Sequence, residues 1–313
     1  MIGTQKAAPL PFLAEGVPAL RIDGVELFDA RKVFDCGQCF RFDPVEDSPH
    51  GVEFAGCAYG KYVSVAQDGD TLYLYNVTLE EYERVWRTYL GLDRDYREIN
   101  AKILSLSQNP ALADAVKLSS GIRILKQDEW EAICSFIISQ NNNIPRIKKL
   151  ITALCRACGD EIDVSGMEKH IASKHREDDG HFYSFPSPRQ VLSLGVSGLY
   201  ELKMGFRAKY LTDAAQKMTD GEIDLAFLRN APTSQCVTHL CTVKGIGPKV
   251  ASCALLFGFA RLDAFPVDVW IKKAITSYFD EGLNPSDLGE YAGVAQQYLF
   301  YYERYLQSKR GNV

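Results

Sequence analysis

Apolar residues change their spacing once along this chain, at about residue 120, and this change limits the folds that the chain can adopt. Before that point, residues 62–77 (YVSVAQDGDTLYLYNV) alternate between apolar and polar side chains around an Asp-Gly-Asp turn, the pattern of a β-hairpin. After it, apolar residues recur every three to four positions, which is typical of amphipathic helices. We therefore expect an α+β protein, with an antiparallel sheet domain over residues 1–118 and an all-α domain over residues 119–313.

Local signals predict several further elements. Residues 19–28 (ALRIDGVELF) and 38–45 (QCFRFDPV) are short strand candidates. Thr78, followed three residues later by Glu81, matches a capping box and predicts that a helix begins there. Asp128 has the position of an N-cap before the apolar run EWEAICSFIISQ. These signals place one helix directly after the hairpin and another at the start of the helical part.

One long polar segment interrupts the helical part, residues 169–188 (KHIASKHREDDGHFYSFPSP). It contains His170, His175 and His181, which could suggest a metal site. Their spacing is irregular for a set of metal ligands, so we interpret the segment as a solvent-exposed loop that holds no metal.

The nine cysteines are scattered over 313 residues, which is typical of reduced thiols rather than of a disulfide framework. Cys36 with Cys39, and Cys155 with Cys158, have the C-x-x-C spacing found in zinc sites. Because these pairs lack the usual flanking residues, we expect free cysteines, with a zinc site as the alternative. No closely spaced group of four cysteines lies near the C-terminus, so we expect no iron–sulfur cluster.

The composition is ordinary for a globular protein, with 46% hydrophobic and 24% charged residues. The chain has no stretch of about 18 apolar residues, the length that a membrane helix needs. Its first residues (MIGTQKAAPLPFLAEGVPAL) lack the apolar centre of a signal peptide. We therefore expect an intracellular protein, in the cytoplasm or nucleoid of a bacterium or in the nucleus of a eukaryote.

The net charge of −5 argues against a surface covered with basic residues, but it does not show where the charges lie. Residues 132–158 contain four basic residues and no acidic one, and residues 203–217 contain four basic residues and one acidic one. Such stretches fit a surface that follows a phosphate backbone. They also fit solvent-exposed helix faces, which charge alone favours.

Residues 243–247 (VKGIG) lie between two apolar helical segments and resemble a helix-hairpin-helix turn. Gly245 and Gly247 allow a positive φ and let the backbone approach another molecule closely. Free amides at the start of the next helix favour an anion such as a DNA phosphate, and Pro248 suits the first helical position because it has no amide hydrogen. Glycine turns between packed helices are also common without any ligand, so the turn alone leaves both interpretations open.

Lys249 stands in the first turn of that second helix, where the helix dipole disfavours a positive charge. Apolar neighbours favour the neutral amine further if they are buried, and only a neutral amine is a nucleophile. A lysine that reaches out to solvent is the alternative. Nineteen residues later, Asp268 has the position of an N-cap, which is a sufficient explanation on its own. As a pair, the amine could attack a sugar carbon while the carboxylate offsets positive charge as a base departs.

Several motifs, taken together, resemble one family of DNA repair enzymes. Residues 245–259 (GIGPKVASCALLFGF) and 265–270 (FPVDVW) look like the helix-hairpin-helix-GPD superfamily of DNA glycosylases. Four more motifs narrow the resemblance to the 8-oxoguanine DNA glycosylases: CGQCFRF at 36–42, SFIISQNNNIPRI at 135–147, MGFRAKY at 204–210 and YAGVAQQYLF at 291–300. These motifs cover nearly the whole chain.

This resemblance implies a bifunctional enzyme that excises 8-oxoguanine opposite cytosine from double-stranded DNA and then nicks the strand. Lys249 matches the nucleophile that attacks C1′ of the damaged nucleotide and forms a Schiff base, from which β-elimination follows. Asp268 matches the catalytic aspartate of the family. The resemblance implies no metal and no other cofactor, and we expect a monomer that binds DNA and no membrane.

The resemblance also implies how the DNA is held. Asn141 matches the residue that fills the space left by the flipped nucleotide, and Phe206 takes the place of an aromatic wedge. Arg146 and Arg207 match two arginines that hydrogen-bond the estranged cytosine. In the hairpin, a DNA phosphate would be held by Lys244, Gly245 and Gly247.

Lesion recognition has a simple physical basis in this resemblance. Guanine has an acceptor at N7, whereas 8-oxoguanine has an N7–H donor, so a carbonyl placed at N7 accepts from the lesion and repels guanine. Gly37 matches the glycine that presents this carbonyl. Cys253 and Phe300 match the residues that stack on the two faces of the lesion, and Gln296 matches the residue that hydrogen-bonds its Watson–Crick edge.

Three positions differ from the animal members of the family. Trp270 stands where a histidine is common, Cys39 replaces a serine, and Phe206 replaces a tyrosine. These differences concern phosphate contacts and the preference for the opposite base, not the lysine chemistry. Two alternatives remain: a DNA-binding module without catalysis, and a glycosylase for other oxidised or alkylated bases.

Overall fold

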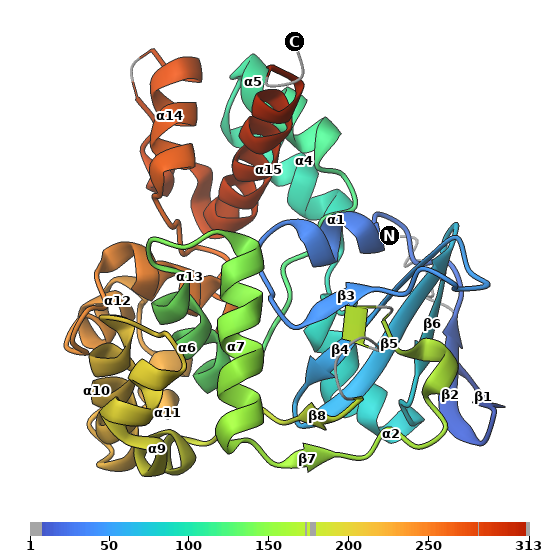
Figure 1. The fold of residues 1–313 in the computed structure, drawn as a ribbon. Coiled ribbons are helices and arrows are strands. Elements are labelled where there is room, and N and C mark those ends of the chain that lie inside the picture. Colours follow the sequence, from blue (N-terminus) through green and yellow to red (C-terminus); the bar gives the residue numbers. More distant parts are fainter. Residues whose placement is uncertain (1–7, 173, 176–179, 281, 311–313) are drawn as a thin grey trace.

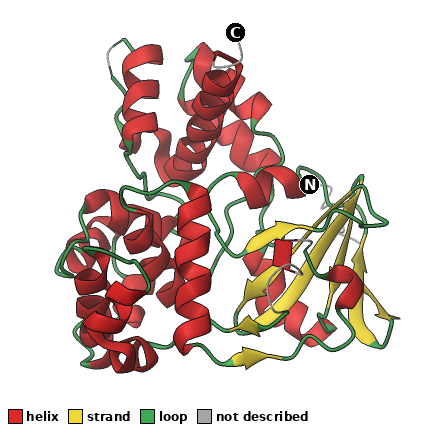
Figure 2. Cartoon of the chain, in the orientation of Figure 1, coloured by secondary structure: helices red, strands yellow, loops and turns green. Residues whose placement is uncertain are grey.

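The computed structural model describes residues 8–172, 174, 175, 180–280 and 282–310. A β-sheet forms one side of the molecule, and helices form the rest (Figures 1 and 2). The sheet lies in the N-terminal part and the remainder is mostly helical, so the predicted α+β class is confirmed.

The sheet has six strands in the order β1-β2-β6-β5-β4-β3, and neighbouring strands run antiparallel. The hairpin predicted over residues 62–77 is confirmed, because β5 and β6 pair with Asp68 opposite Thr71. Gly69 supplies the positive φ of 57° that this tight turn requires. The strands are β1 (Leu10–Ala14), β2 (Val17–Ile22), β3 (Phe42–Pro44), β4 (Val52–Ala58), β5 (Lys61–Asp68) and β6 (Thr71–Tyr75).

Helices cover one face of the sheet. The first is α1 (Ala30–Asp35), which Asp29 caps through its side chain. The second is a continuous helical segment made of α2 (Leu79–Glu81), the π-helical η1 (Tyr82–Trp86) and α3 (Arg87–Tyr89). It begins with the predicted capping box of Thr78 and Glu81, which is confirmed. Apolar side chains of both helical segments pack against the strands in one buried cluster, which includes Phe34, Leu74 and Trp86.

The opposite face of the sheet is covered by the segment between α7 (Ile144–Cys158) and α9 (Pro188–Glu201). We expected a solvent-exposed loop there, and that prediction is wrong for most of the described part. Met167, His170, Ala172 and Phe182 are buried against sheet residues such as Tyr62. The few apolar side chains of this polar segment are needed because an antiparallel sheet with two apolar faces requires a cover on both.

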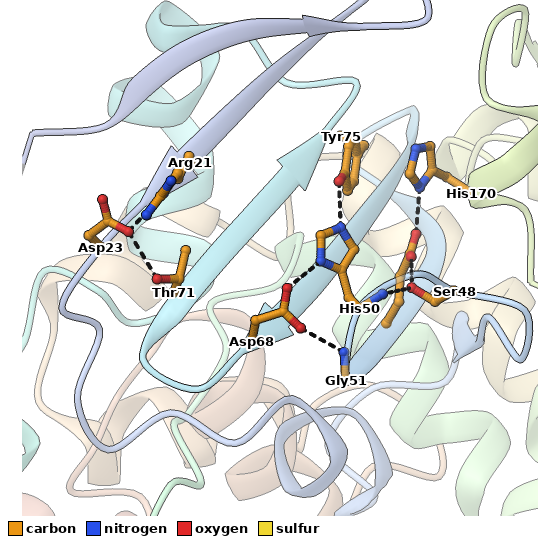
Figure 3. Close-up of polar contacts among 10 residues, drawn as sticks. Arg21, Asp23, Ser48, His50, Gly51, Asp68, Thr71, Tyr75 and His170 are labelled. Atoms are coloured by element: carbon orange, nitrogen blue, oxygen red, sulfur yellow. Dashed lines mark hydrogen bonds and ion pairs between the residues drawn. The ribbon is translucent and has the colours of Figure 1, made fainter.

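His170 is fixed by two contacts with the sheet. Its ring stacks on Tyr75, with centroids 3.7 Å apart, and its Nδ1 lies 2.7 Å from Oε1 of Glu53 (Figure 3). Burial alone would raise the pKa of Glu53, but hydrogen bonds from His170, Ser48 and Ser64 outweigh it and lower that pKa. His175 is also held, with Nε2 3.0 Å from Oδ2 of Asp43, whereas His181 is exposed as expected.

The same segment contributes two short strands to the otherwise mostly helical second part of the chain. β7 (Glu161–Ile162) and β8 (Phe182–Tyr183) form a small antiparallel sheet of two strands. A short 3₁₀ helix, η2 (Glu168–His170), lies between them in the chain.

The helices that do not cover the sheet form two groups (Figure 1). In the first, α13 packs against α6 and α12, and α10 packs against α6 and α9. Its helices besides α7 and α9 are α6 (Glu129–Ser139), α10 (Arg207–Thr219), α11 (Leu225–Asn230), α12 (Thr233–Leu240) and α13 (Pro248–Gly258). The predicted N-cap Asp128 at the start of α6 is confirmed, since its side chain accepts from the amide of Glu131.

In the second group, α15 packs against α5 and α14, and α4 packs against the 3₁₀ helix η3. The group contains α4 (Tyr96–Leu106), α5 (Pro110–Leu118), α14 (Val269–Tyr278), η3 (Pro285–Tyr291) and α15 (Ala292–Arg310). Helices that precede residue 119 thus share one packing unit with the last helices of the chain, and the boundary that we expect at residue 118 stays a prediction. In the described part of the chain, no helix combines the length and the apolar character that a bilayer-spanning segment needs.

Candidate active site

The turn between α12 and α13 forms a helical hairpin that packs against α10 and is hydrogen-bonded to it. Gly245 has a φ of 82°, and a Cβ on it would lie 2.2 Å from the ring of Tyr210, so only glycine fits. The amide of Lys244 donates to Oδ2 of Asp213 over 2.7 Å, and Nζ of Lys217 donates to the carbonyl of Thr242 over 2.6 Å. These bonds hold the turn in place.

Gly247 differs from Gly245, because it does not use the positive φ that a glycine allows. Its φ is −99°, an ordinary extended value, and it is the N-cap of α13. A Cβ on Gly247 would meet no atom within 4 Å. The absence of a side chain at Gly247 therefore leaves open space beside the first amides of α13, where a second molecule can approach the backbone.

The two glycines should therefore respond differently to substitution. Gly245→Ala should lower the free energy of unfolding by about 2 kcal/mol or more, through the clash with Tyr210 and the strained φ. Gly247→Ser should unfold like the parent protein, because serine is a good N-cap and has room, but should bind duplex DNA several-fold more weakly. Urea unfolding and fluorescence anisotropy with a labelled duplex would measure both effects. Equal loss of stability in the two variants would contradict this interpretation.

Lys249 lies half-buried in the first turn of α13. Its Nζ is 5.9 Å from the centre of the Phe136 ring, which belongs to α6. One turn later on α13 lies the buried thiol of Cys253. Burial raises the pKa of Cys253 to about 11, the charge of Asp268 adds to this effect, and Lys249 opposes it. The amine and the carboxylate therefore both lie close to one thiol.

Asp268 is the N-cap of α14, as predicted. Its Oδ1 accepts hydrogen bonds from the amides of Trp270 and Ile271, over 3.0 and 2.9 Å. These bonds fix the carboxylate at the start of α14, and they satisfy amides that the helix itself leaves free. The chain thus places Lys249 and Asp268 in the first turn or cap of two helices, with Cys253 near both.

Gly37 follows α1, and the fold brings it to α15. It has a φ of 79°, and the position of a Cβ on it would lie 3.7 Å from Cε1 of Phe300 and 3.6 Å from Cδ1 of Ile144. The structure therefore brings together Gly37 and Phe300. The family resemblance assigns both residues to lesion recognition, although they lie far apart in the sequence.

The carbonyl of Gly37 is left open while its neighbours are occupied. The carbonyl of Cys36 accepts from Nε2 of Gln297 over 2.9 Å, and the carbonyl of Gln38 accepts from Nε2 of Gln127 over 2.6 Å. The side chain of Gln38 forms three further bonds, with main-chain atoms of Val33, Arg123 and Leu125. Among the described residues, none donates a hydrogen bond to the Gly37 carbonyl. A rigid loop therefore presents one free acceptor.

Gln296 lies one turn before Phe300 on α15 and is only 4% exposed. Its Oε1 is buried and has no hydrogen-bond partner in the part of the chain that the structure describes. A buried polar atom without a partner costs about 1–3 kcal/mol. Native proteins seldom keep such an atom without a reason, and a ligand that donates a hydrogen bond is one.

The predicted wedge and cytosine-reading residues also lie together. Arg207 is 5% exposed, and its Nε donates to the carbonyl of Gln140, over 2.9 Å, directly before Asn141. Burial lowers the pKa of Arg207, and the charge of the nearby Arg146 lowers it further. Arg146 itself is exposed, and Asn141 is exposed with a φ of 51°.

Phe206 is 43% exposed and is supported from behind. The Arg207 guanidinium lies 4.4 Å from the centre of its ring, and the Tyr210 ring meets it edge-on at 5.6 Å. Tyr210 also packs against Gly245, so one ring joins the wedge residue to the hairpin. The sequence alone assigns no role to Tyr210, although its spacing of four residues after Phe206 on a helix places the two side chains on one face.

The two C-x-x-C pairs consist of free thiols. All nine cysteines are free, and burial raises the pKa of Cys36 to about 12, so this thiol stays protonated. In the described ranges, no group of three or more His, Cys, Asp or Glu side chains is arranged to hold a metal ion.

Comparison with known proteins points to one family. Residues 20–133 match the family model of the 8-oxoguanine DNA glycosylase N-terminal domain, and residues 134–286 match that of the HhH-GPD superfamily base excision DNA repair proteins. The N-glycosylase/DNA lyase OGG1 of Arabidopsis thaliana is 31% identical, in an alignment that covers 62% of this chain and 55% of the relative. An N-glycosylase/DNA lyase of Saccharomyces cerevisiae is 33% identical, in an alignment that covers 56% of this chain and 46% of the yeast protein. The chain thus matches about half the length of these curated relatives.

Solved structures agree with the family models over nearly the whole chain. MBOgg1 in complex with a low-affinity DNA ligand has a TM-score of 0.83 and 37% identity, covering 96% of this chain and 100% of its own. A second solved structure is the Clostridium acetobutylicum 8-oxoguanine glycosylase/lyase, bound to double-stranded DNA with cytosine opposite 8-oxoguanine. It has a TM-score of 0.83 and 33% identity, and the match covers 97% of this chain and 100% of the Clostridium chain. The chain belongs to the 8-oxoguanine DNA glycosylase family of the HhH-GPD superfamily.

Proposed function

We propose that this chain is a base-excision-repair DNA glycosylase with abasic-site lyase activity, and that its substrate is 8-oxoguanine opposite cytosine in double-stranded DNA. The observation that carries the proposal is the placement of Lys249 in the first turn of α13 and of Asp268 at the N-cap of α14, with both charges acting on the pKa of Cys253. This pair stands at the starts of two helices from different groups.

The chemistry follows from these two side chains. Lys249 Nζ donates its lone pair to C1′, and the bond between C1′ and the base breaks with its electrons leaving on the base. The Asp268 carboxylate stabilises the positive charge that develops on the sugar. The C1′–O4′ bond then opens with its electrons on O4′, which takes up the proton lost from the nitrogen, and the Schiff base between C1′ and Nζ results. Removal of a C2′ proton lets the C3′–O3′ bond break, which nicks the strand.

Discrimination of the lesion rests on donors and acceptors. The open carbonyl of Gly37 accepts the N7–H of 8-oxoguanine, whereas guanine would place a lone pair against it. The unpartnered Oε1 of Gln296 accepts from the Watson–Crick edge. Cys253 and Phe300 stack on the two faces of the base. Guanine would lose one bond and gain a repulsion, so it is released unprocessed.

Two further parts of the molecule bind the DNA around the lesion: the wedge and cytosine-reading residues, and the hairpin between α12 and α13. Asn141 and Phe206 fill the space that the flipped nucleotide leaves, and Arg146 and Arg207 hydrogen-bond the estranged cytosine. The hairpin holds a phosphate through its amides and Lys244. The enzyme acts as a monomer, needs no cofactor, and works inside the cell, in the cytoplasm or nucleoid of a bacterium or in a eukaryotic nucleus.

Comparing three substrates would test this function. Duplexes that carry 8-oxoguanine, thymine glycol or methyladenine should differ, with excision and nicking only at 8-oxoguanine opposite cytosine. Faster excision of methyladenine or thymine glycol would assign the chain to another substrate class. Binding without any product would indicate a DNA-binding module that lacks catalysis.

A further inference from the structure

The loop that presents Gly37 is held from α15 as well as from its own domain. Gln297, Phe300 and Arg304 lie at positions i, i+3 and i+7 of α15, so they share one face of the helix. This face meets residues 35–37. The lesion-facing Phe300 thus stands between two polar side chains that contact the backbone before Gly37.

The two polar contacts are specific. Gln297 is 2% exposed, and its Nε2 donates to the carbonyl of Cys36 over 2.9 Å. Nη1 of Arg304 donates to the carbonyl of Asp35 over 3.4 Å and lies 3.9 Å from the position of a Cβ on Gly37. The guanidinium of Arg304 also lies 5.6 Å from the centre of the Phe300 ring. Arg304 therefore contacts both the loop and the ring.

Gly37 needs such restraints because glycine populates many backbone conformations, and a small rotation would turn its carbonyl away from a bound base. We propose that Gln297 and Arg304 form a clasp that holds the Gly37 carbonyl and the Phe300 ring in one arrangement, and that this clasp determines specificity for 8-oxoguanine. The inference rests on the function proposed above. Both residues are positioning residues, since they act on the lesion through Gly37 and Phe300.

A base analogue separates this role from general stabilisation of the fold. 8-Oxo-7-deazaguanine has a C–H group in place of N7–H, so it cannot donate to the Gly37 carbonyl. In a Lys249→Gln parent, which cannot react, the duplex with 8-oxoguanine should bind at least tenfold more tightly than the duplex with the analogue. Adding Arg304→Met should lower this ratio at least fivefold, mainly by weakening the 8-oxoguanine complex.

A matched control lies five residues away on the same helix. Nζ of Lys309 lies 5.5 Å from the centre of the Tyr305 ring, the same kind of contact outside the loop. Lys309→Met should leave the binding ratio unchanged. In the protein that keeps Lys249, Arg304→Met should nick a preformed abasic site within twofold of the parent rate, because that substrate has no base to read.

Gln297→Met removes the other half of the clasp and should reduce the ratio in the same way. Thermal unfolding checks that each variant is folded. Gln297 is buried, so the Gln297→Met variant can fail to fold; Arg304 is partly exposed, and the Arg304→Met variant then still tests the proposal. A parent that binds 8-oxoguanine, guanine and analogue duplexes equally would overturn the proposed function and the clasp with it. A parent that discriminates, with an Arg304→Met variant that discriminates as well, would overturn the clasp alone.

Discussion

Replacing Lys249 by glutamine should abolish both base release and strand nicking, with a loss of about 10³-fold or more in single-turnover rate. Glutamine keeps the length of the side chain but has no nucleophilic amine. Lys249 is only half-buried in the first turn of α13, and glutamine is about as good a helix former as lysine, so the fold should be as stable as before. Tight binding of the lesion duplex should therefore remain.

Lys244→Gln is the matched control for that variant. Lys244 is exposed in the hairpin, five residues before Lys249, and its proposed role is to hold a phosphate. Its loss should weaken duplex binding, more at low salt, while the rate at saturating protein stays close to the parent rate. Gel analysis with and without piperidine distinguishes base release from nicking. Nicking by the Lys249→Gln variant at the parent rate would contradict the assignment of the nucleophile.

Asp268→Asn should lower the single-turnover rate about 10²–10³-fold while the protein unfolds at nearly the same urea concentration. Asparagine caps a helix about as well as aspartate, so the bonds to the amides of Trp270 and Ile271 can persist. Only the negative charge next to the developing positive charge on the sugar is lost. The rate loss should appear at saturating DNA, because the charge acts in the transition state.

Asp268→Ala separates the two functions of this carboxylate. It removes the cap together with the charge, so it should lose the same rate and, in addition, about 1 kcal/mol of unfolding free energy. Urea unfolding and single-turnover excision measure both quantities on the same preparations. If the asparagine variant kept the parent rate, Asp268 would be a helix cap without a part in the chemistry.

The sequence predicted what short-range physics determines. The hairpin around Gly69, the capping box at Thr78 and the N-caps at Asp128 and Asp268 depend on residues within about four positions, and all are present. The helical hairpin was predicted for the same reason. Its glycines were treated alike, although one is required by the Tyr210 ring and the other faces open space.

Long-range packing could not be predicted in the same way. The polar segment with His170 was interpreted as a loop because its few apolar residues follow no period, yet they cover one face of the sheet. The approach of Gly37 to Phe300 was expected only through the family resemblance, since no local pattern links residues so far apart. The contacts of Gln297 and Arg304 could not be predicted, because both side chains donate to backbone carbonyls, and no sequence pattern specifies such partners.

In the proposed reaction, the amine of Lys249 bonds to the deoxyribose. Reduction with borohydride during reaction with an 8-oxoguanine duplex, followed by proteolysis and mass spectrometry, tests it most directly. We expect a stable protein–DNA adduct whose modified peptide contains Lys249, and no adduct with the Lys249→Gln variant. An adduct on another lysine such as Lys244, or nicking without any trapped adduct, would contradict it.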